Sequence, residues 1–100
     1  MARMPSRKLE RRLNDISQRL KTLRADAAVA EEQLAHFAAE ADDARLRALV
    51  SETPIATADA RTTQRHADSM RAVHEEMLRS ILALEREQDA VLDQMSAARP

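Results

Sequence analysis

The sequence predicts an all-α protein, an antiparallel coiled-coil hairpin made of two helices. Three observations support this prediction. Of the 100 residues, 20 are Ala, one is aromatic and none is Gly, a composition that favours helices over strands and turns. The three prolines stand at positions 5, 54 and 100, so no proline interrupts the two stretches between them. In both stretches, apolar residues recur at alternating spacings of three and four, the pattern of a coiled-coil seam.

The first helix is expected over about residues 6–50. Its heptad positions are all apolar, and they are Leu9, Leu13, Ile16, Leu20, Leu23, Ala27, Ala30, Leu34, Phe37, Ala41, Ala44 and Ala48. The turn is expected at residues 51–54, where Thr53 can cap the next helix and Pro54 suits its first turn. Because this turn lacks glycine, we expect none of its residues to adopt the left-handed conformation.

The second helix is expected over about residues 55–98, so that residues 1–100 form a single helical hairpin. Its heptad positions are Ala56, Ala60, Thr63, Ala67, Met70, His74, Met77, Ile81, Leu84, Gln88, Val91, Met95 and Ala98. Larger apolar residues gather near the chain ends, whereas the layers near the turn are built from Ala and Thr. The end of the hairpin at the turn is therefore expected to be narrower and less stable than the other end.

Two registers would place the seams of the two helices against each other. In the first, paired residue numbers sum to 104, as for Leu20 with Leu84; in the second they sum to 111, as for Phe37 with His74. The first register leaves a shorter loop, seven residues against fourteen. Its facing charges also agree better: it pairs Arg19 with Glu87, Glu31 with Arg71 and Arg47 with Asp59, while the second gains Arg24 with Glu85 but opposes Asp26 to Glu87. The first register is therefore predicted.

Several functional classes are excluded by what the sequence lacks. Phosphate loops and dinucleotide sites require Gly, and disulfides and thiolate metal sites require Cys, but the chain contains neither residue. A two-helix rod also offers no concave pocket, so we expect no enzyme activity, no cofactor and no small-molecule substrate. A metal cluster of Glu32, His36, Glu40 and His66 is conceivable from helical spacing, but such a stripe arises by chance on a charged helix, and no metal site is predicted.

The sequence also bears on location. It contains no run of about 18 apolar residues, so we expect no membrane span. Its first residues are charged and lack the apolar stretch of a secretory signal. We therefore expect a cytoplasmic protein.

Two groups of apolar residues fall outside the seam and are candidate interaction residues. On the second helix these are Val73, Leu78, Leu82 and Leu92, which we expect to support self-association, as a homodimer that forms a four-helix bundle. Near the turn they are Leu46, Leu49, Val50 and Ile55. We expect the second group to fold over the turn as a cap; the alternative is an exposed tip that enters a groove of a partner protein. The leading functional hypothesis is a non-catalytic coiled-coil interaction or scaffold protein that self-associates or docks on a larger partner.

The uneven distribution of charge suggests two alternative functions. Residues 1–24 have a net charge of +6, eight basic residues against Glu10 and Asp15, and they could contact nucleic acid. The candidate phosphate contacts are Arg3, Arg7, Lys8, Arg11 and Arg12. Near the turn the acids Asp42, Asp43 and Glu52 make the hairpin similar to the amino-terminal arm of transcript-cleavage factors. This resemblance implies a regulator that enters RNA polymerase with its acidic tip.

Overall fold

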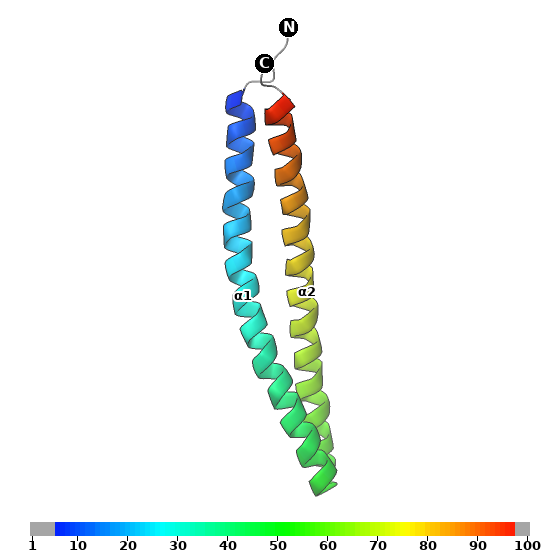
Figure 1. Ribbon diagram of the computed structural model, residues 1–100. Helices are drawn as coiled ribbons and strands as arrows, with labels where there is room; N and C mark the ends of the chain where they lie inside the picture. Colours follow the sequence, from blue (N-terminus) through cyan, green and yellow to red (C-terminus); the bar gives the residue numbers. More distant parts are fainter. Residues whose placement is uncertain (1–5, 98–100) are drawn as a thin grey trace. The chain divides into compact units, whose positions relative to one another are not determined.

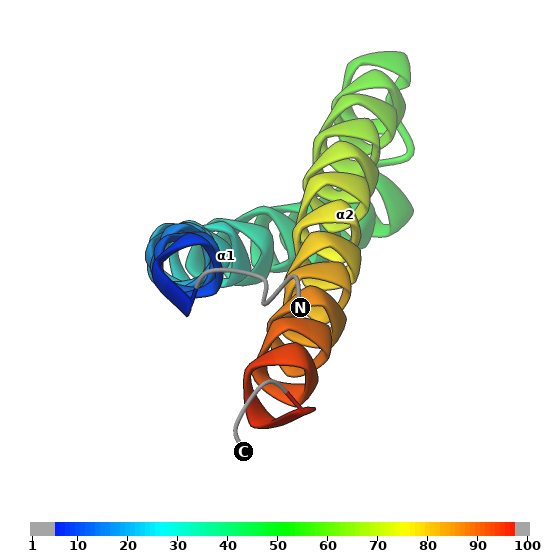
Figure 2. The same cartoon turned by 90° about the horizontal axis from the view of Figure 1, so that it is seen from above.

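The structure of the protein is a computed structural model that describes residues 6–97. Helix α1 (Ser6–Ser51) and helix α2 (Pro54–Ala97) are joined by Glu52 and Thr53 (Figure 1). Figure 2 shows the same two helices from above, each as one continuous coil. Residues 6–97 contain no strand. The all-α hairpin is confirmed, and the helix ends that the structure describes agree with the predicted ones to within one residue.

The C-terminus of α1 is closed by Glu52, which has a φ of 52°. Its N–H donates a hydrogen bond to the carbonyl oxygen of Ala48 at 3.0 Å. This single bond, from the residue after the helix to a carbonyl in its last turn, requires a left-handed residue. The expectation that no turn residue adopts this conformation is therefore wrong. In the absence of glycine, a residue with a Cβ occupies the position, at a cost of about 1–2 kcal/mol.

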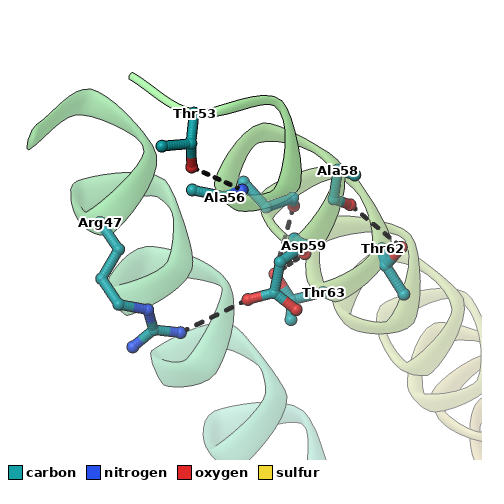
Figure 3. Close-up of polar contacts among 8 residues, drawn as sticks. Arg47, Thr53, Ala56, Ala58, Asp59, Thr62 and Thr63 are labelled. Carbon is teal, nitrogen blue, oxygen red and sulfur yellow. Dashed lines mark hydrogen bonds and ion pairs between the residues drawn. The ribbon is translucent and has the colours of Figure 1, made fainter. Parts of the chain in front are cut away.

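The N-terminus of α2 is capped by Thr53, as predicted. The backbone N–H of Ala56 donates to Oγ1 of Thr53 at 3.2 Å (Figure 3). The N–H of Thr57 donates to the Thr53 carbonyl at 3.1 Å. Pro54 is the first residue of the helix, where its missing N–H leaves no bond unmade. The whole reversal of the chain therefore takes only two residues outside the helices.

The chain forms two compact halves. The base half contains residues 6–26 and 77–97, and the turn half contains residues 27–76. Every predicted seam residue that the structure describes is buried or half-buried, while nearly all other side chains are exposed. The predicted seam is thus confirmed along both helices, and only Ala98 lies outside the described residues.

The two halves differ in what they bury. In the base half Leu9, Ile16, Leu20 and Val91 form a buried cluster, against which Leu13, Ile81, Leu84 and Met95 pack. In the turn half the buried side chains are those of Ala27, Ala30, Ala41, Ala44 and Ala67. The predicted contrast between a leucine-rich and an alanine-rich end is therefore present in the structure.

Contacts between α1 and α2 support the predicted register in both halves. In the base half Gln88 Nε2 donates to Ser17 Oγ at 3.2 Å. In the turn half Arg47 pairs with Asp59 at 3.5 Å, and the rings of Phe37 and His66 are edge to face, 6.1 Å apart. The residue numbers in these contacts sum to 105, 106 and 103, all close to 104 and well below 111.

Two base-half ion pairs differ from the expected ones. Glu87 pairs with Arg12 at 3.5 Å rather than with Arg19. Arg24 pairs with Glu85 at 3.1 Å, although this contact was assigned to the other register. Both differences have one physical reason: an arginine side chain is long enough to reach a full helical turn along the partner helix. Individual charge pairs therefore determine register less strictly than the apolar layers.

Candidate interaction surfaces

Three leucines of α2 form one exposed row in the base half. Leu78, Leu82 and Leu92 are 48%, 48% and 45% exposed. At 100° per residue they lie within a sector of about 80° of the helix circumference. We call these three residues the leucine row. Its members lie beside the seam, so they extend the apolar surface of α2 beyond the part that α1 covers.

The heptad pattern predicts Val73 to lie off the seam like these leucines, and its side chain is 46% exposed. It belongs to the turn half, and it lies about 140° around α2 from Leu78. The leucine row therefore does not include Val73. Val29, 54% exposed in the turn half, is a further exposed apolar residue that the heptad pattern does not indicate.

The four apolar residues near the turn lie exposed. The exposed fractions of Leu46, Leu49, Val50 and Ile55 are 57%, 68%, 86% and 82%. The expected cap over the turn is therefore wrong for a single copy of the chain. The physical reason is the length of the connection, because Glu52 and Thr53 alone cannot form a loop under which these side chains could pack.

A hollow lined by arginines lies on one side of the turn half. It has a volume of about 400 Å³ and is lined by Arg45, Thr57, Ala60, Arg61, Gln64 and Arg65. Arg45 pairs with Asp42 at 3.2 Å, and Arg65 donates to the hydroxyl of Thr62 at 3.3 Å. Among residues 6–97, Arg61 and Arg65 have no carboxylate partner. We call Arg45, Arg61 and Arg65 the basic flank.

A second hollow in the turn half is lined mainly by acids. Its volume is about 430 Å³, and it is lined by Glu40, Asp43, Arg47, Asp59 and Thr63. Arg47 neutralises Asp59 through the ion pair shown in Figure 3. Glu40 lies 3.1 Å from Nε2 of His36, a partner that is charged only when protonated. Asp43 has no ion pair within residues 6–97. We call Glu40, Asp43 and Asp59 the acidic flank.

The candidate phosphate contacts at the start of α1 are only partly available. Arg7, Lys8 and Arg11 are exposed and have no ion pair with another residue that the structure describes. Arg12 is already paired with Glu87, and Arg3 lies outside the described residues. Nucleic-acid binding by this arm stays a prediction.

The acids that suggested a polymerase-binding tip do not form one group. Asp42 is paired with Arg45, Asp43 belongs to the acidic flank, and Glu52 is the left-handed residue of the turn. Polymerase binding also stays a prediction.

The four residues considered for a metal cluster are not brought together. His36 contacts Glu40 at 3.1 Å, whereas the ring of His66 lies against Phe37. Within residues 6–97 there is no group of three or more acidic or histidine side chains that could hold a metal ion.

Neither helix, over the part that the structure describes, has a stretch long and apolar enough to cross a membrane. Comparisons of the chain with protein-family models, with curated proteins and with solved structures found no match. Functional inference therefore rests on the surfaces described above.

Proposed function

We propose that the chain is a non-catalytic coiled-coil interaction protein that self-associates through the leucine row. The observation that supports this proposal is the row itself, three leucines in one sector of α2, each nearly half exposed beside a seam that is otherwise covered. Packing the rows of two copies together would continue the core of the base half across two hairpins. A homodimer of this kind is a four-helix bundle.

The energetics favour a concentration-dependent dimer rather than a permanent one. Full burial of a leucine side chain stabilises by roughly 1.5–3 kcal/mol, and each leucine of the row has about half of its surface left to bury. Association costs at least about 4 kcal/mol in lost translational and rotational freedom. The six leucines of two rows together gain roughly 4.5–9 kcal/mol, which exceeds the lower end of this cost only modestly. Docking of the same row on a larger apolar partner, the other form of the proposal, would use the same residues.

The test is the oligomeric state of the chain with Leu78→Gln and Leu82→Gln. Glutamine keeps the helix propensity of leucine but removes its apolar surface. At about 1 M salt, where contacts between exposed charges are screened, we expect the wild-type chain to dimerise at tens of micromolar and the double variant to be monomeric, with the helical circular dichroism signal unchanged. Light scattering coupled to size exclusion measures the mass.

The matched control is Val73→Gln, which removes a similarly exposed apolar side chain about 140° away from Leu78 around α2. This variant should dimerise like the wild type. A wild-type chain that is monomeric at this concentration would exclude self-association through the row. Equal loss of the dimer in the control would show that the row is not the interface.

A further inference from the structure

The two charged flanks of the turn half lie on opposite sides of the hairpin. Arg45 and Arg47 are two residues apart in α1, and Thr57 and Asp59 are two residues apart in α2. Residues two apart point about 200° away from each other on a helix. Arg45 and Thr57 line the basic hollow, whereas Arg47 and Asp59 line the acidic one. One side of the turn half is therefore basic and the other acidic.

Within one copy of the chain, most of the positive charge of the basic flank has no carboxylate partner. Of the basic flank only Arg45 has a carboxylate partner, Asp42 at 3.2 Å. Arg65 is hydrogen-bonded to a neutral hydroxyl, and Arg61 has no hydrogen bond or ion pair with another described residue. Two guanidinium groups are thus left to be neutralised by something outside the chain, and each presents several N–H donors suited to carboxylates.

The acidic side mirrors this arrangement. Of the acidic flank only Asp59 is neutralised, by Arg47 at 3.5 Å. Glu40 has a partner that is uncharged unless protonated, and Asp43 has no ion pair within residues 6–97. Two carboxylates are left over on this side, matching the two guanidinium groups on the other.

We propose that the basic flank of one copy docks on the acidic flank of a second copy. The two sides of the same chain are complementary in the sign and in the number of their uncompensated charges. The contact is heterologous, because different surfaces of the two copies meet. Such contacts continue from copy to copy and form rings or filaments instead of stopping at a dimer. This inference deepens the proposed self-association by adding a second, lateral interface in the turn half.

The physical signature of this interface is its dependence on salt. All its charged groups are exposed, so their attraction is screened within about 10 Å at 0.1 M salt and within about 3 Å at 1 M. Each exposed pair contributes only a few tenths of a kcal/mol to about 1 kcal/mol, so the lateral contact is weaker than that of the leucine row and requires a higher protein concentration. Lateral association should therefore occur at low salt and disappear at high salt. The apolar contact of the leucine row should not weaken in this way.

A charge-swap complementation experiment tests the inference. The background is the full chain with Leu78→Gln and Leu82→Gln, so that association through the leucine row does not contribute. The first variant, Arg61→Glu with Arg65→Glu, has two acidic sides, and the second, Glu40→Arg with Asp43→Arg, has two basic sides. Sedimentation velocity measures association at low and high salt.

We expect the background chain to associate at low salt and to become monomeric at high salt. Each charge variant alone should be monomeric at both salt concentrations, and an equimolar mixture of the two should associate again at low salt. A neutral variant, Arg61→Gln with Arg65→Gln, should lose association without any added repulsion. Circular dichroism verifies that all variants remain helical.

Three results would overturn the inference: a background chain that is monomeric at low salt, charge variants that associate like the background, or a mixture that stays monomeric. Each of these leaves the leucine-row proposal intact, because that proposal is tested at high salt, by the loss of the dimer when Leu78 and Leu82 are replaced by glutamine. Conversely, a wild-type chain whose association disappears at high salt would exclude the leucine row and support the flanks.

Discussion

The residue that departs most from expectation is Glu52. The chain reverses direction through two residues, and a helix that ends so abruptly needs a left-handed residue to close its last turn. Glycine adopts this conformation without strain, but the chain has no glycine. Glu52 therefore takes a backbone conformation that costs free energy, and neighbouring structure must offset it. The cap formed by Thr53 and the hydrogen bond to Ala48 supply part of that compensation.

This strain can be measured with Glu52→Gly. We expect the variant to raise the free energy of unfolding by about 0.5–1 kcal/mol, since relief of Cβ strain exceeds the extra entropy that glycine gains in the unfolded chain. Glu31→Gly, at an exposed site inside α1, is the control and should lower the free energy of unfolding by about 1 kcal/mol. Urea denaturation followed by circular dichroism measures both. Destabilisation by Glu52→Gly would contradict the strained conformation.

The pairing of the two helices depends on layers of seam residues more than on charges. Most predicted layers are apolar, the polar members being Thr63, His74 and Gln88, and the described seam residues are all buried or half-buried. Ion pairs tolerate shifts of a full turn, as the contact between Arg24 and Glu85 shows. The polar contact of Gln88 with Ser17 is more restrictive, because both side chains are short or half-buried and their hydrogen bond lies next to the core of the base half. Such polar layers commonly specify register.

The register is tested by paired cysteines that replace seam alanines of the turn half. Cysteines at Ala44 and Ala60 pair in the first register, and cysteines at Ala44 and Ala67 would pair in the second. We expect rapid disulfide formation for the first pair and little for the second, because a disulfide requires Cα atoms within about 7 Å. Non-reducing electrophoresis after mild oxidation measures the yield. Each variant replaces two alanines, so the second pair is a matched control; preferential cross-linking of Ala44 and Ala67 would refute the register.

At the scale of the whole molecule, the two compact halves are stabilised unequally. The largest fully buried side chains, those of Leu9, Leu20 and Val91, all belong to the base half. The turn half buries mainly alanine, and each missing buried methylene costs about 0.8 kcal/mol of hydrophobic stabilisation. The exposed apolar residues at the turn add nothing to the stability of a single copy. The turn half should therefore open more readily.

Native-state hydrogen exchange measures this difference. Amides in residues 27–76 are expected to exchange at least about tenfold faster than amides in the base half, a difference of about 1.4 kcal/mol in opening free energy. Leu20→Ala, which truncates a fully buried leucine, should lower base-half protection by roughly 2–5 kcal/mol. Equal protection in both halves would contradict the unequal packing.

Fold class, helix bounds, seam positions, the Thr53 cap and the contrast between the halves could all be predicted from the sequence alone. The reason is that each depends on local propensity or on a short periodic spacing, which the order of residues expresses directly. The left-handed Glu52 was missed because it follows from how α1 ends, and the expected cap at the turn was wrong because its formation depends on how the chain reverses.

Only the tertiary structure decided which off-seam residues stay exposed and which residues of α1 and α2 share a surface. It separated Val73 from the leucine row, and it brought charges from both helices together into a basic and an acidic flank. The distribution of net charge along the sequence could not show these flanks, because each flank combines residues from both helices. Residues two positions away along each helix, such as Arg47 from Arg45, lie on the opposite side. The sequence by itself thus determined that the chain forms a helical hairpin, while the surfaces with which it can bind depend on register and side-chain direction, which exist only once the helices have packed.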